Sequence, residues 1–323
     1  MNLWPETEER PVVTVASFLE AAGTALDIEL HAGAKGLQRP IPEAALNRPG
    51  LALCGFFKHF PNRRIQLLGL SELAYLSSLS EAERCARLEA FFKRRMPCLV
   101  VARHKRLFPE IAPLAERYEV PVLRSSMITM NFVNAATILM ENLMAPRLKV
   151  QGTMLEIMGM GVLIMGRSGI GKSDTALGLI KQGHALVADD ITQLRLDSAG
   201  CVIAAAVKVT RYHMEIRGVG IIHVPALYGV GAVRGEKKLD LIAVLSAPTD
   251  AAGARVLESH GVRRVFGVPV SEVVIVVTPG RDLGNVIEAA ARNEKLRSLG
   301  HDAEKELDTQ LMQALRGGRQ ASE

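Results

Sequence analysis

Residues 166–173 have the residue types and the spacing of a phosphate-binding loop. They fit the pattern G-x-x-x-x-G-K-[ST], whose glycines let the backbone curl so that successive N–H groups point at phosphate oxygens. The lysine would reach the terminal phosphates, and the hydroxyl that follows it would ligate magnesium. The pattern therefore predicts binding of a nucleoside triphosphate with Mg²⁺, and phosphoryl transfer, through Gly166, Arg167, Ser168, Gly169, Ile170, Gly171, Lys172 and Ser173.

The sequence on both sides of this loop favours a bound phosphate over a glycine-rich turn without a ligand. Residues 161–165 are apolar and predict a strand that leads into the loop, and residues 174–181 have the spacing of an amphipathic helix. Gly183 follows as a helix stop. This order puts the N-terminus of a helix, with its partial positive charge, at the phosphates.

Two adjacent carboxylates, Asp189 and Asp190, are expected next to the loop. A helix over residues 173–182 rises about 15 Å, and a strand over residues 184–189 returns about 20 Å. Because a strand–helix–strand unit returns parallel, the strand ends beside the loop. One carboxylate could hold magnesium and the other could accept a proton from an attacking hydroxyl. A solvated surface pair is the alternative.

A third segment offers a carboxylate and a guanidinium. Glu215 and Arg217 alternate with apolar residues, which predicts that both lie on one face of a strand. Such a pair suits a metal ion and a phosphate. An exposed strand with a salt bridge would have the same spacing, and the pattern alone does not separate the two interpretations.

The elements that must position these groups form two predicted domains. Alternating strand and helix patterns over residues 1–145 indicate an α/β domain, and a proline at position 146 follows a long helical stretch. Residues 146–315 hold the phosphate loop and form the catalytic domain. Residues 316–323 are rich in glycine and polar residues, and we expect a disordered tail.

Composition narrows the functional class. The 323-residue chain has a net charge of +5, short basic clusters and only 4% aromatic residues, and it carries no nucleic-acid motif. We therefore expect no nucleic acid as a partner. The apolar runs are too short to cross a membrane, and the N-terminus turns acidic, unlike a secretion signal. We expect a cytoplasmic protein without a membrane anchor, whose four scattered cysteines stay reduced.

Several blocks of the chain together resemble the HPr kinase/phosphorylase family. The similarity extends over roughly residues 40–300 and rests on two blocks in the first half and four in the second. The run Glu-Ile-Arg-Gly in the second half is its most specific part, because generic nucleotide-binding proteins lack it. The blocks are residues 47–57, 64–69, 166–190, 215–222, 228–234 and 278–283.

The resemblance implies a concrete activity and architecture. Members of the family phosphorylate a serine of the small phosphocarrier protein HPr with ATP or pyrophosphate. They also remove this phosphate with inorganic phosphate, which yields pyrophosphate. They are homohexamers whose C-terminal P-loop domain is similar to phosphoenolpyruvate carboxykinase and whose N-terminal α/β domain is similar to a Mur ligase domain.

The resemblance also implies roles for individual residues. Lys172 would contact the donor phosphates, and Ser173 and Glu215 would serve magnesium. Asp190 would accept the serine proton and return it in the reverse reaction. Arg255 lies near the position of the family's catalytic arginine, although its surroundings match poorly. The block at residues 277–282 matches the region that the family uses for dephosphorylation.

Two positions depart from the family pattern. Where the family usually has a histidine shortly before the loop, this chain has Gln151, whose amide does not titrate near neutral pH. Asp282 stands where asparagine is common. We hypothesise that Gln151 preserves the kinase direction and weakens any step that needs an imidazole proton.

Two other functions fit the same motifs. The chain could be a nucleotide-sensing regulator that binds ATP and phosphorylates no protein, for which the departure at Gln151 and the basic clusters leave room. It could instead be a small-molecule kinase or carboxykinase on the same fold. The block at residues 47–57 argues against the latter, because it resembles the two-domain protein kinases.

Overall fold

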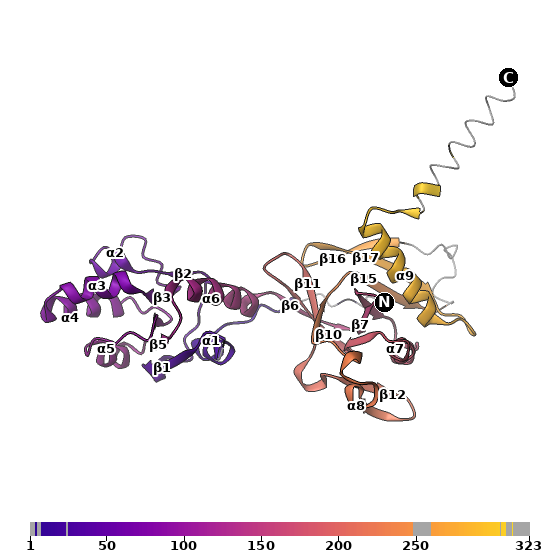
Figure 1. The fold of residues 1–323 in the computed structure, drawn as a ribbon, viewed down its shortest axis with the longest axis horizontal. Coiled ribbons are helices and arrows are strands. Elements are labelled where there is room, and N and C mark those ends of the chain that lie inside the picture. Colours follow the sequence, from indigo (N-terminus) through magenta and orange to yellow (C-terminus); the bar gives the residue numbers. More distant parts are fainter. Residues whose placement is uncertain are drawn as a thin grey trace, which may run out of the picture. The chain divides into compact units, whose positions relative to one another are not determined.

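Alternating strands and helices build both halves of the chain, as the computed structural model in Figure 1 shows. The structure describes residues 4, 8–23, 25–247, 260–303, 305–307 and 312. The chain divides into two compact units, one formed by Glu9–Pro146 and the other by Arg147–Glu323 together with Met1–Glu8. Trp4 belongs to the second unit, where the guanidinium carbon of Arg263 lies 5.2 Å from the centre of its ring. The first domain predicted from the sequence, residues 1–145, included residue 4.

The first unit is a five-stranded sheet covered by helices on both faces. Its strand order is β1-β5-β4-β3-β2, and only β1 is antiparallel to its neighbour. Both faces of β3 and β4 are buried, as expected for central parallel strands. Residues of α1 and α6 pack on one face, and residues of α2, α3, α4 and α5 pack on the other.

The elements of this unit follow in chain order. The strands are β1 Ile28–Ala32, β2 Leu46–Asn47, β3 Ile65–Leu68, β4 Leu99–Val101 and β5 Val122–Ser125. The helices are α1 Val15–Ala22, η1 Ala34–Gly36, α2 Gly50–Leu53, α3 Leu70–Ser78, α4 Glu81–Phe92, α5 Ile111–Tyr118 and α6 Thr129–Met144.

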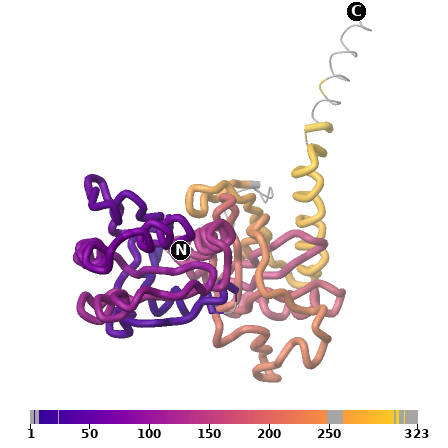
Figure 2. Tube along the Cα trace, turned by 60° about the vertical axis from the view of Figure 1, so that its left-hand side comes forward, coloured from indigo at the N-terminus to yellow at the C-terminus, as the bar shows by residue number. Residues whose placement is uncertain are grey.

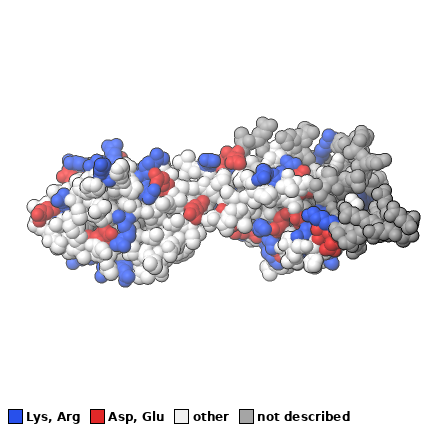
Figure 3. All heavy atoms as spheres, turned by 90° about the horizontal axis from the view of Figure 1, so that it is seen from above, with Lys and Arg blue, Asp and Glu red and all other residues white. Residues whose placement is uncertain are grey.

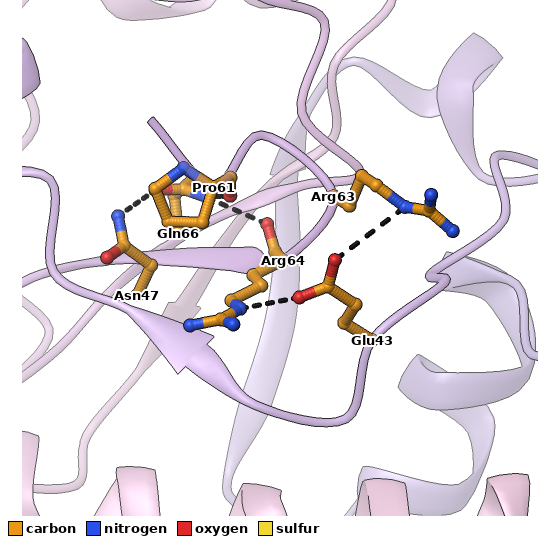
Figure 4. Close-up of polar contacts among 6 residues, drawn as sticks. All are labelled: Glu43, Asn47, Pro61, Arg63, Arg64 and Gln66. Carbon is orange, nitrogen blue, oxygen red and sulfur yellow. Dashed lines mark hydrogen bonds and ion pairs between the residues drawn. The ribbon is translucent and has the colours of Figure 1, made fainter. Parts of the chain in front are cut away.

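A buried amide joins β2 to β3 within two of the sequence blocks named above (Figure 4). The side chain of Gln66 is fully buried. Its Oε1 accepts a hydrogen bond of 2.7 Å from Asn47 Nδ2, and its Nε2 donates to the carbonyls of Pro61 and Arg64, each at 2.9 Å. Arg64 Nε in turn lies 2.6 Å from Glu43 Oε2. The amide is satisfied on both sides, so its burial stabilises the strand pair.

The second unit is built around a six-stranded mixed sheet with the order β16-β17-β15-β8-β7-β9. Helices α7 and α9 cover one face. A four-stranded sheet with the order β14-β11-β10-β6 packs on the other face. A separate hairpin, β12-β13, lies with α8 in a segment that extends beyond these sheets in both ribbon views (Figures 1 and 2). Helix α7 contacts β12.

The strands of this unit are β6 Arg147–Gln151, β7 Thr153–Ile157, β8 Met160–Met165, β9 Ala185–Ala188, β10 Ile191–Leu196, β11 Val202–Ala206, β12 His213–Ile216, β13 Gly220–His223, β14 Glu236–Lys238, β15 Leu241–Ser246, β16 His260–Val265 and β17 Val268–Val276. Its helices are α7 Lys172–Lys181, η2 Lys208–Thr210, α8 Val224–Tyr228, η3 Val230–Ala232 and α9 Leu283–Ser298. The mixed α/β fold predicted from the sequence is confirmed.

The surface of the described residues carries charged side chains of both signs. Lysine and arginine side chains lie in separate groups across the face seen in Figure 3, among acidic and uncharged residues. No helix that the structure describes combines the length and the apolar composition of a membrane span.

Candidate active site

The phosphate loop connects β8 to α7, as predicted. Gly166 follows β8 with a φ of 153°, and a Cβ at this position would lie 2.9 Å from the carbonyl oxygen of Leu245 on β15. A side chain larger than hydrogen is therefore excluded there. Gly171, with a φ of 103°, adopts a left-handed conformation as the N-cap of α7. The helix begins at Lys172 and ends at Lys181, directly before Gln182 and Gly183.

The ammonium group of Lys172 lies against the loop that precedes it. Its Nζ donates to the carbonyl oxygen of Gly166 at 2.8 Å and to that of Arg167 at 3.1 Å. The side chain is 8% exposed. Burial lowers the pKa of Lys172, while the charges of Asp190 and Asp189 oppose this shift. The loop thus holds a cation next to the two carboxylates.

The chain returns to the loop through a strand that is parallel to β8 without being its neighbour. Strand β7 lies between β8 and β9 and is antiparallel to both. Two antiparallel steps leave β9 parallel to β8, so β9 ends at the sheet edge that carries the loop. The predicted proximity is confirmed by the 3.4 Å distance between Ser173 Oγ and Asp189 Oδ1. The position of β7 between β8 and β9 was not predicted from the sequence.

Asp189 is a buried acceptor that ties three elements together. It is 6% exposed at the end of β9. Its Oδ1 accepts hydrogen bonds from Thr153 Oγ1 on β7 at 2.8 Å and from Ser173 Oγ on α7 at 3.4 Å, and its Oδ2 accepts from the N–H of Glu215 on β12 at 3.2 Å. Burial raises the pKa of Asp189, although the hydrogen bonds from Thr153 and Glu215 oppose that rise.

Asp190 has a different environment, although it is the next residue. Its φ of 61° is left-handed, and its side chain is exposed. Its carbonyl oxygen accepts a 2.8 Å hydrogen bond from the N–H of Gly152. This turn directs the chain from β9 into β10 and separates the two carboxylates. One of the pair is fixed inside the protein, and the other is available to a ligand.

Glu215 and Arg217 reach the same site from the β12-β13 hairpin. Glu215 is exposed on β12, whose buried positions alternate with exposed ones. Arg217 lies in the turn after the strand, so the prediction that both residues belong to the strand is wrong for Arg217. The strand ends at Ile216 because the chain reverses there to pair with β13. A Cβ at Gly169 would lie 3.3 Å from Arg217 Nη2, which places the guanidinium against the phosphate loop.

These side chains surround one pocket of about 380 Å³. It brings together residues of the loop, both carboxylates and the hairpin. The remaining loop residues, Gly166, Arg167 and Ile170, are not part of its lining, and Arg255 lies outside the described residues. Gln151 and Thr153 also reach the pocket. The lining consists of Gln151, Thr153, Ser168, Gly169, Gly171, Lys172, Ser173, Asp174, Asp189, Asp190, Glu215, Ile216, Arg217, Gly218 and Gly220.

Thr153 is the site residue that sequence reasoning missed. Its side chain is buried on β7 and orients Asp189 by a hydrogen bond. Its signal in the sequence is a single polar residue at the start of an apolar strand. That signal is too weak to identify it, because threonine is common in strands.

The oxygen donors of the pocket fit magnesium. Ser173 Oγ and the carboxylates of Asp189 and Glu215 line it together. Within the described residues, no group of three or more His, Cys, Asp or Glu side chains lies close enough to hold a metal ion. Magnesium is normally bound by one or two carboxylates together with substrate phosphates and water. The residues present match that requirement.

Asp282, one of the two departures, has a structural role. Its Oδ1 accepts a 3.2 Å hydrogen bond from the N–H of Asn285 and caps the N-terminus of α9. Its Oδ2 accepts from Asn285 Nδ2 at 2.9 Å. A carboxylate suits this position because it satisfies an unpaired N–H and complements the helix dipole.

Asp189→Asn is expected to gain stability relative to the wild type as the pH rises. Burial raises the pKa of Asp189, so the folded state disfavours its ionisation. The wild type therefore loses stability as the pH rises from the ordinary aspartate value of 3.8 through the raised pKa, whereas asparagine does not titrate. Thermal unfolding of both proteins at pH ~3.5, below the ordinary aspartate value, and at pH ~7.5 measures this difference.

Comparing the two pH values removes any constant offset in that experiment. The amide also changes the hydrogen bond that Asp189 Oδ2 accepts from the N–H of Glu215. The part of this change that does not depend on pH cancels, and the rest is already included in the direction of the pKa shift. Asp174→Asn, at an exposed residue of the same pocket, controls for the removal of a charge. A difference between Asp189→Asn and the wild type that stays constant or shrinks with rising pH contradicts the expectation.

Two family models match nearly the whole chain. The model described as HPr Serine kinase N terminus matches residues 13–140. The model described as HPr Serine kinase C-terminal domain matches residues 142–311, which are more than half of the chain.

Curated relatives and a solved structure are similar to the chain as well. The HPr kinase/phosphorylase of Caldicellulosiruptor bescii is 36% identical over 298 residues, which cover 92% of this chain and 96% of that protein. The HPr kinase/phosphorylase of Geobacillus sp. (strain WCH70) is 38% identical over 293 residues, covering 90% and 94%. The solved HPr(Ser) kinase/phosphatase of Coxiella burnetii is 32% identical, covers 49% of this chain and 97% of its own, and has a TM-score of 0.44.

Proposed function

The chain belongs to the HPr kinase/phosphorylase family, and we propose that it phosphorylates a serine of HPr with ATP or pyrophosphate and reverses this with inorganic phosphate. One observation on the residues of this chain supports the proposal most directly. The phosphate loop and the exposed carboxylate of Asp190 line the same pocket. A donor phosphate held by the loop would thus lie next to a base that can take the proton of an incoming hydroxyl.

We assign the binding of the phosphoryl donor and its Mg²⁺ to the loop, to Lys172 and to the oxygen atoms of Ser173 and Glu215. The N–H groups of the loop and the ammonium of Lys172 would hold the terminal phosphates. Ser173 and Glu215 would hold Mg²⁺, and Asp189 would keep the Ser173 hydroxyl in place. Bound Mg²⁺ would neutralise negative charge on the phosphate oxygens during transfer. Arg217 beside the loop would stabilise the same charge.

In the forward step, the serine oxygen of HPr forms a bond to the terminal phosphorus while the bond from that phosphorus to the bridging oxygen breaks. Asp190 accepts the serine proton, and ADP leaves, or phosphate when pyrophosphate is the donor. In the reverse step, an oxygen of inorganic phosphate attacks the phosphoserine. Asp190 then returns a proton to the leaving serine oxygen, and pyrophosphate is released. One residue suits both directions because the reverse step retraces the forward one.

The assembly, the domain limits and the location extend the proposal. The family resemblance supports a homohexamer, and the sequence pattern supports a cytoplasmic protein with domain limits at residues 1–145, 146–315 and 316–323. The N-terminal segment is the exception to these limits, because residues 1–8 group with the second unit. Light scattering on the purified full chain tests the hexamer. A monomer or dimer at all protein concentrations would refute it.

A phosphotransfer assay tests the activity. The chain is incubated with purified HPr, Mg²⁺ and labelled ATP or pyrophosphate, and phospho-HPr is then incubated with inorganic phosphate. We expect phosphoserine in the first reaction and pyrophosphate in the second. ATP binding without phosphoserine would instead favour a nucleotide sensor. Phosphorylation of a small molecule in place of HPr would favour the small-molecule kinase.

Gln151→His is expected to accelerate the phosphorolytic direction more than the kinase direction. Gln151 is the last residue of β6, pairs with Ile191 next to Asp190, and is exposed at the pocket. An imidazole there would supply a group that titrates near neutral pH, and positioned acid–base groups contribute roughly 100-fold or more to rate. Initial rates with phospho-HPr and with ATP measure the ratio of the two directions.

Gln151→Asn is the matched control for this substitution. It keeps an amide that cannot titrate and is expected to leave the ratio of the two directions at the wild-type value. An unchanged rate of phosphate-dependent release in Gln151→His would defeat the hypothesis.

A further inference from the structure

The first unit contains a cavity of about 290 Å³ with an unusually basic lining. It belongs to the unit that does not hold the phosphate loop. Two arginines and two histidines line it together with apolar residues, and none of the described residues in the lining is acidic. The lining consists of His31, His104, Arg106, Leu107, Phe108, Pro109, Ala112 and Arg124.

The cavity is lined by the loop that follows β4 and by residues of β1, β5 and α5. Parallel strands β4 and β5 are neighbours, and the loop that follows β4 contributes most of the lining. The loop begins with four consecutive basic residues, Arg103, His104, Lys105 and Arg106.

Hydrogen bonds to β5 hold this basic loop in place. The N–H of His104 donates to the carbonyl oxygen of Ser125 at 2.8 Å, and Arg124 Nη2 donates to the carbonyl oxygen of His104 at 2.8 Å. Arg103 and His104 both have left-handed φ angles, of 65° and 44°. Such conformations are costly outside glycine and are often found at functional sites. The cations are therefore presented by a fixed backbone.

Arg124 forms a partly buried cationic side of the cavity. It is 25% exposed, and Glu29 Oε1 on β1 lies 3.5 Å from its Nη1. Glu29 offsets part of the charge of Arg124, while the lining itself adds the guanidinium of Arg106 and the imidazoles of His31 and His104. The positive charge thus exceeds the negative charge around the cavity.

The opposite wall is apolar and packs on the core of the first unit. Phe108 and Leu107 pack against the core cluster of α4 and α5. The guanidinium carbon of Arg84 lies 4.7 Å from the ring centre of Phe108. A ligand would therefore meet cations on one side and a hydrocarbon wall on the other. The volume is at the lower end of small-molecule sites and suits a compact molecule.

We propose that this cavity is a second binding site, which takes a small metabolite carrying phosphate or carboxylate groups on a short carbon skeleton. Arg124 and Arg106 bind its oxyanion by charge-assisted hydrogen bonds, and both side chains can approach an oxyanion in a bidentate geometry. His31 and His104 contact the same anion. The site does not depend on the phosphoryl transfer reaction.

Histidine protection in the full-length protein tests the site directly. The chain is treated with diethyl pyrocarbonate in inorganic phosphate, in citrate, or in sodium chloride of equal ionic strength, and modified peptides are quantified by mass spectrometry. When the anion concentration is ten times the dissociation constant of the site, the bound anion should slow the modification of His31 and His104 about tenfold. His59, an exposed histidine of the same unit outside the cavity, should react at an unchanged rate. The readout is local, so anions bound at the phosphate loop do not affect it.

Variants separate this site from general ionic effects. Arg106→Gln, at an exposed residue, and Arg124→Gln should each weaken protection roughly tenfold or more. Arg63→Gln, 67% exposed and outside the cavity, should not change it. Protection by phosphate alone identifies a phosphorylated ligand, and protection by citrate alone a carboxylate. Protection by neither anion, equal protection of His59, or full protection in Arg106→Gln would overturn the proposal, even if Arg124→Gln failed to fold.

Discussion

Asp190→Asn is expected to lower the rate of phosphoryl transfer to HPr by about 10²–10⁴-fold while nucleotide binding is preserved. The amide keeps the size of the side chain but cannot accept the serine proton. Asparagine also tolerates the left-handed φ of 61° at this position, so the turn between β9 and β10 should be unchanged. The loss would then report on proton transfer and not on folding.

Single-turnover kinetics with phospho-HPr and with ATP measure this loss in both directions. Both rates should fall together, because one carboxylate takes the proton forward and returns it in reverse. Asp174→Asn is the matched control, since it removes a charge from an exposed residue of the same pocket and should have a much smaller effect. A normal transfer rate in Asp190→Asn would remove Asp190 from the mechanism and leave Asp189 as the candidate base.

Lys172→Ala is expected to weaken binding of the nucleotide by roughly 10–100-fold, because the donor phosphates lose a charge-assisted hydrogen bond. The same ammonium bonds to the carbonyls of Gly166 and Arg167. Truncation would therefore also loosen the loop. Lys172→Met also loses these hydrogen bonds but keeps the apolar stem, so its comparison with Lys172→Ala separates the loss of the ammonium group from the loss of side-chain packing.

Calorimetric titration with a non-hydrolysable ATP analogue and Mg²⁺ measures the affinity of each variant. Lys181→Met is the control, because this exposed lysine belongs to the last turn of the same helix and does not line the pocket. Equal affinities in the wild type and both Lys172 variants would show that the loop binds phosphate without this residue.

The position of Asp190 shows what can be predicted from chain order. A helix and a strand of matching length return the chain to the sheet edge where it left, whichever strand lies between them. Chain order therefore predicts that Asp189 and Asp190 lie at the loop, although it does not predict the position of β7. It could not distinguish the two residues by burial, because the residues that bury Asp189 come from β7 and β12, far away in the sequence.

Arg217 illustrates the limit of periodicity. Alternation with apolar residues continues one position beyond the end of β12, so spacing alone extended the strand to Arg217. The turn is set by pairing between β12 and β13. The contact of its guanidinium with Gly169 depends on how the hairpin packs near α7, which no local pattern records.

The sequence by itself determined the phosphate loop, the flanking strand and helix, the two-domain α/β organisation and the family, because each is encoded in residue types at short, fixed spacing. Only the tertiary structure decided that Asp189 is an internal acceptor and Asp190 an exposed one, that Thr153 orients Asp189, and that basic side chains gather around a cavity in the first unit. These features arise where segments distant in the chain come into contact. Their energies depend on burial and on partners, which are absent from any single stretch of sequence.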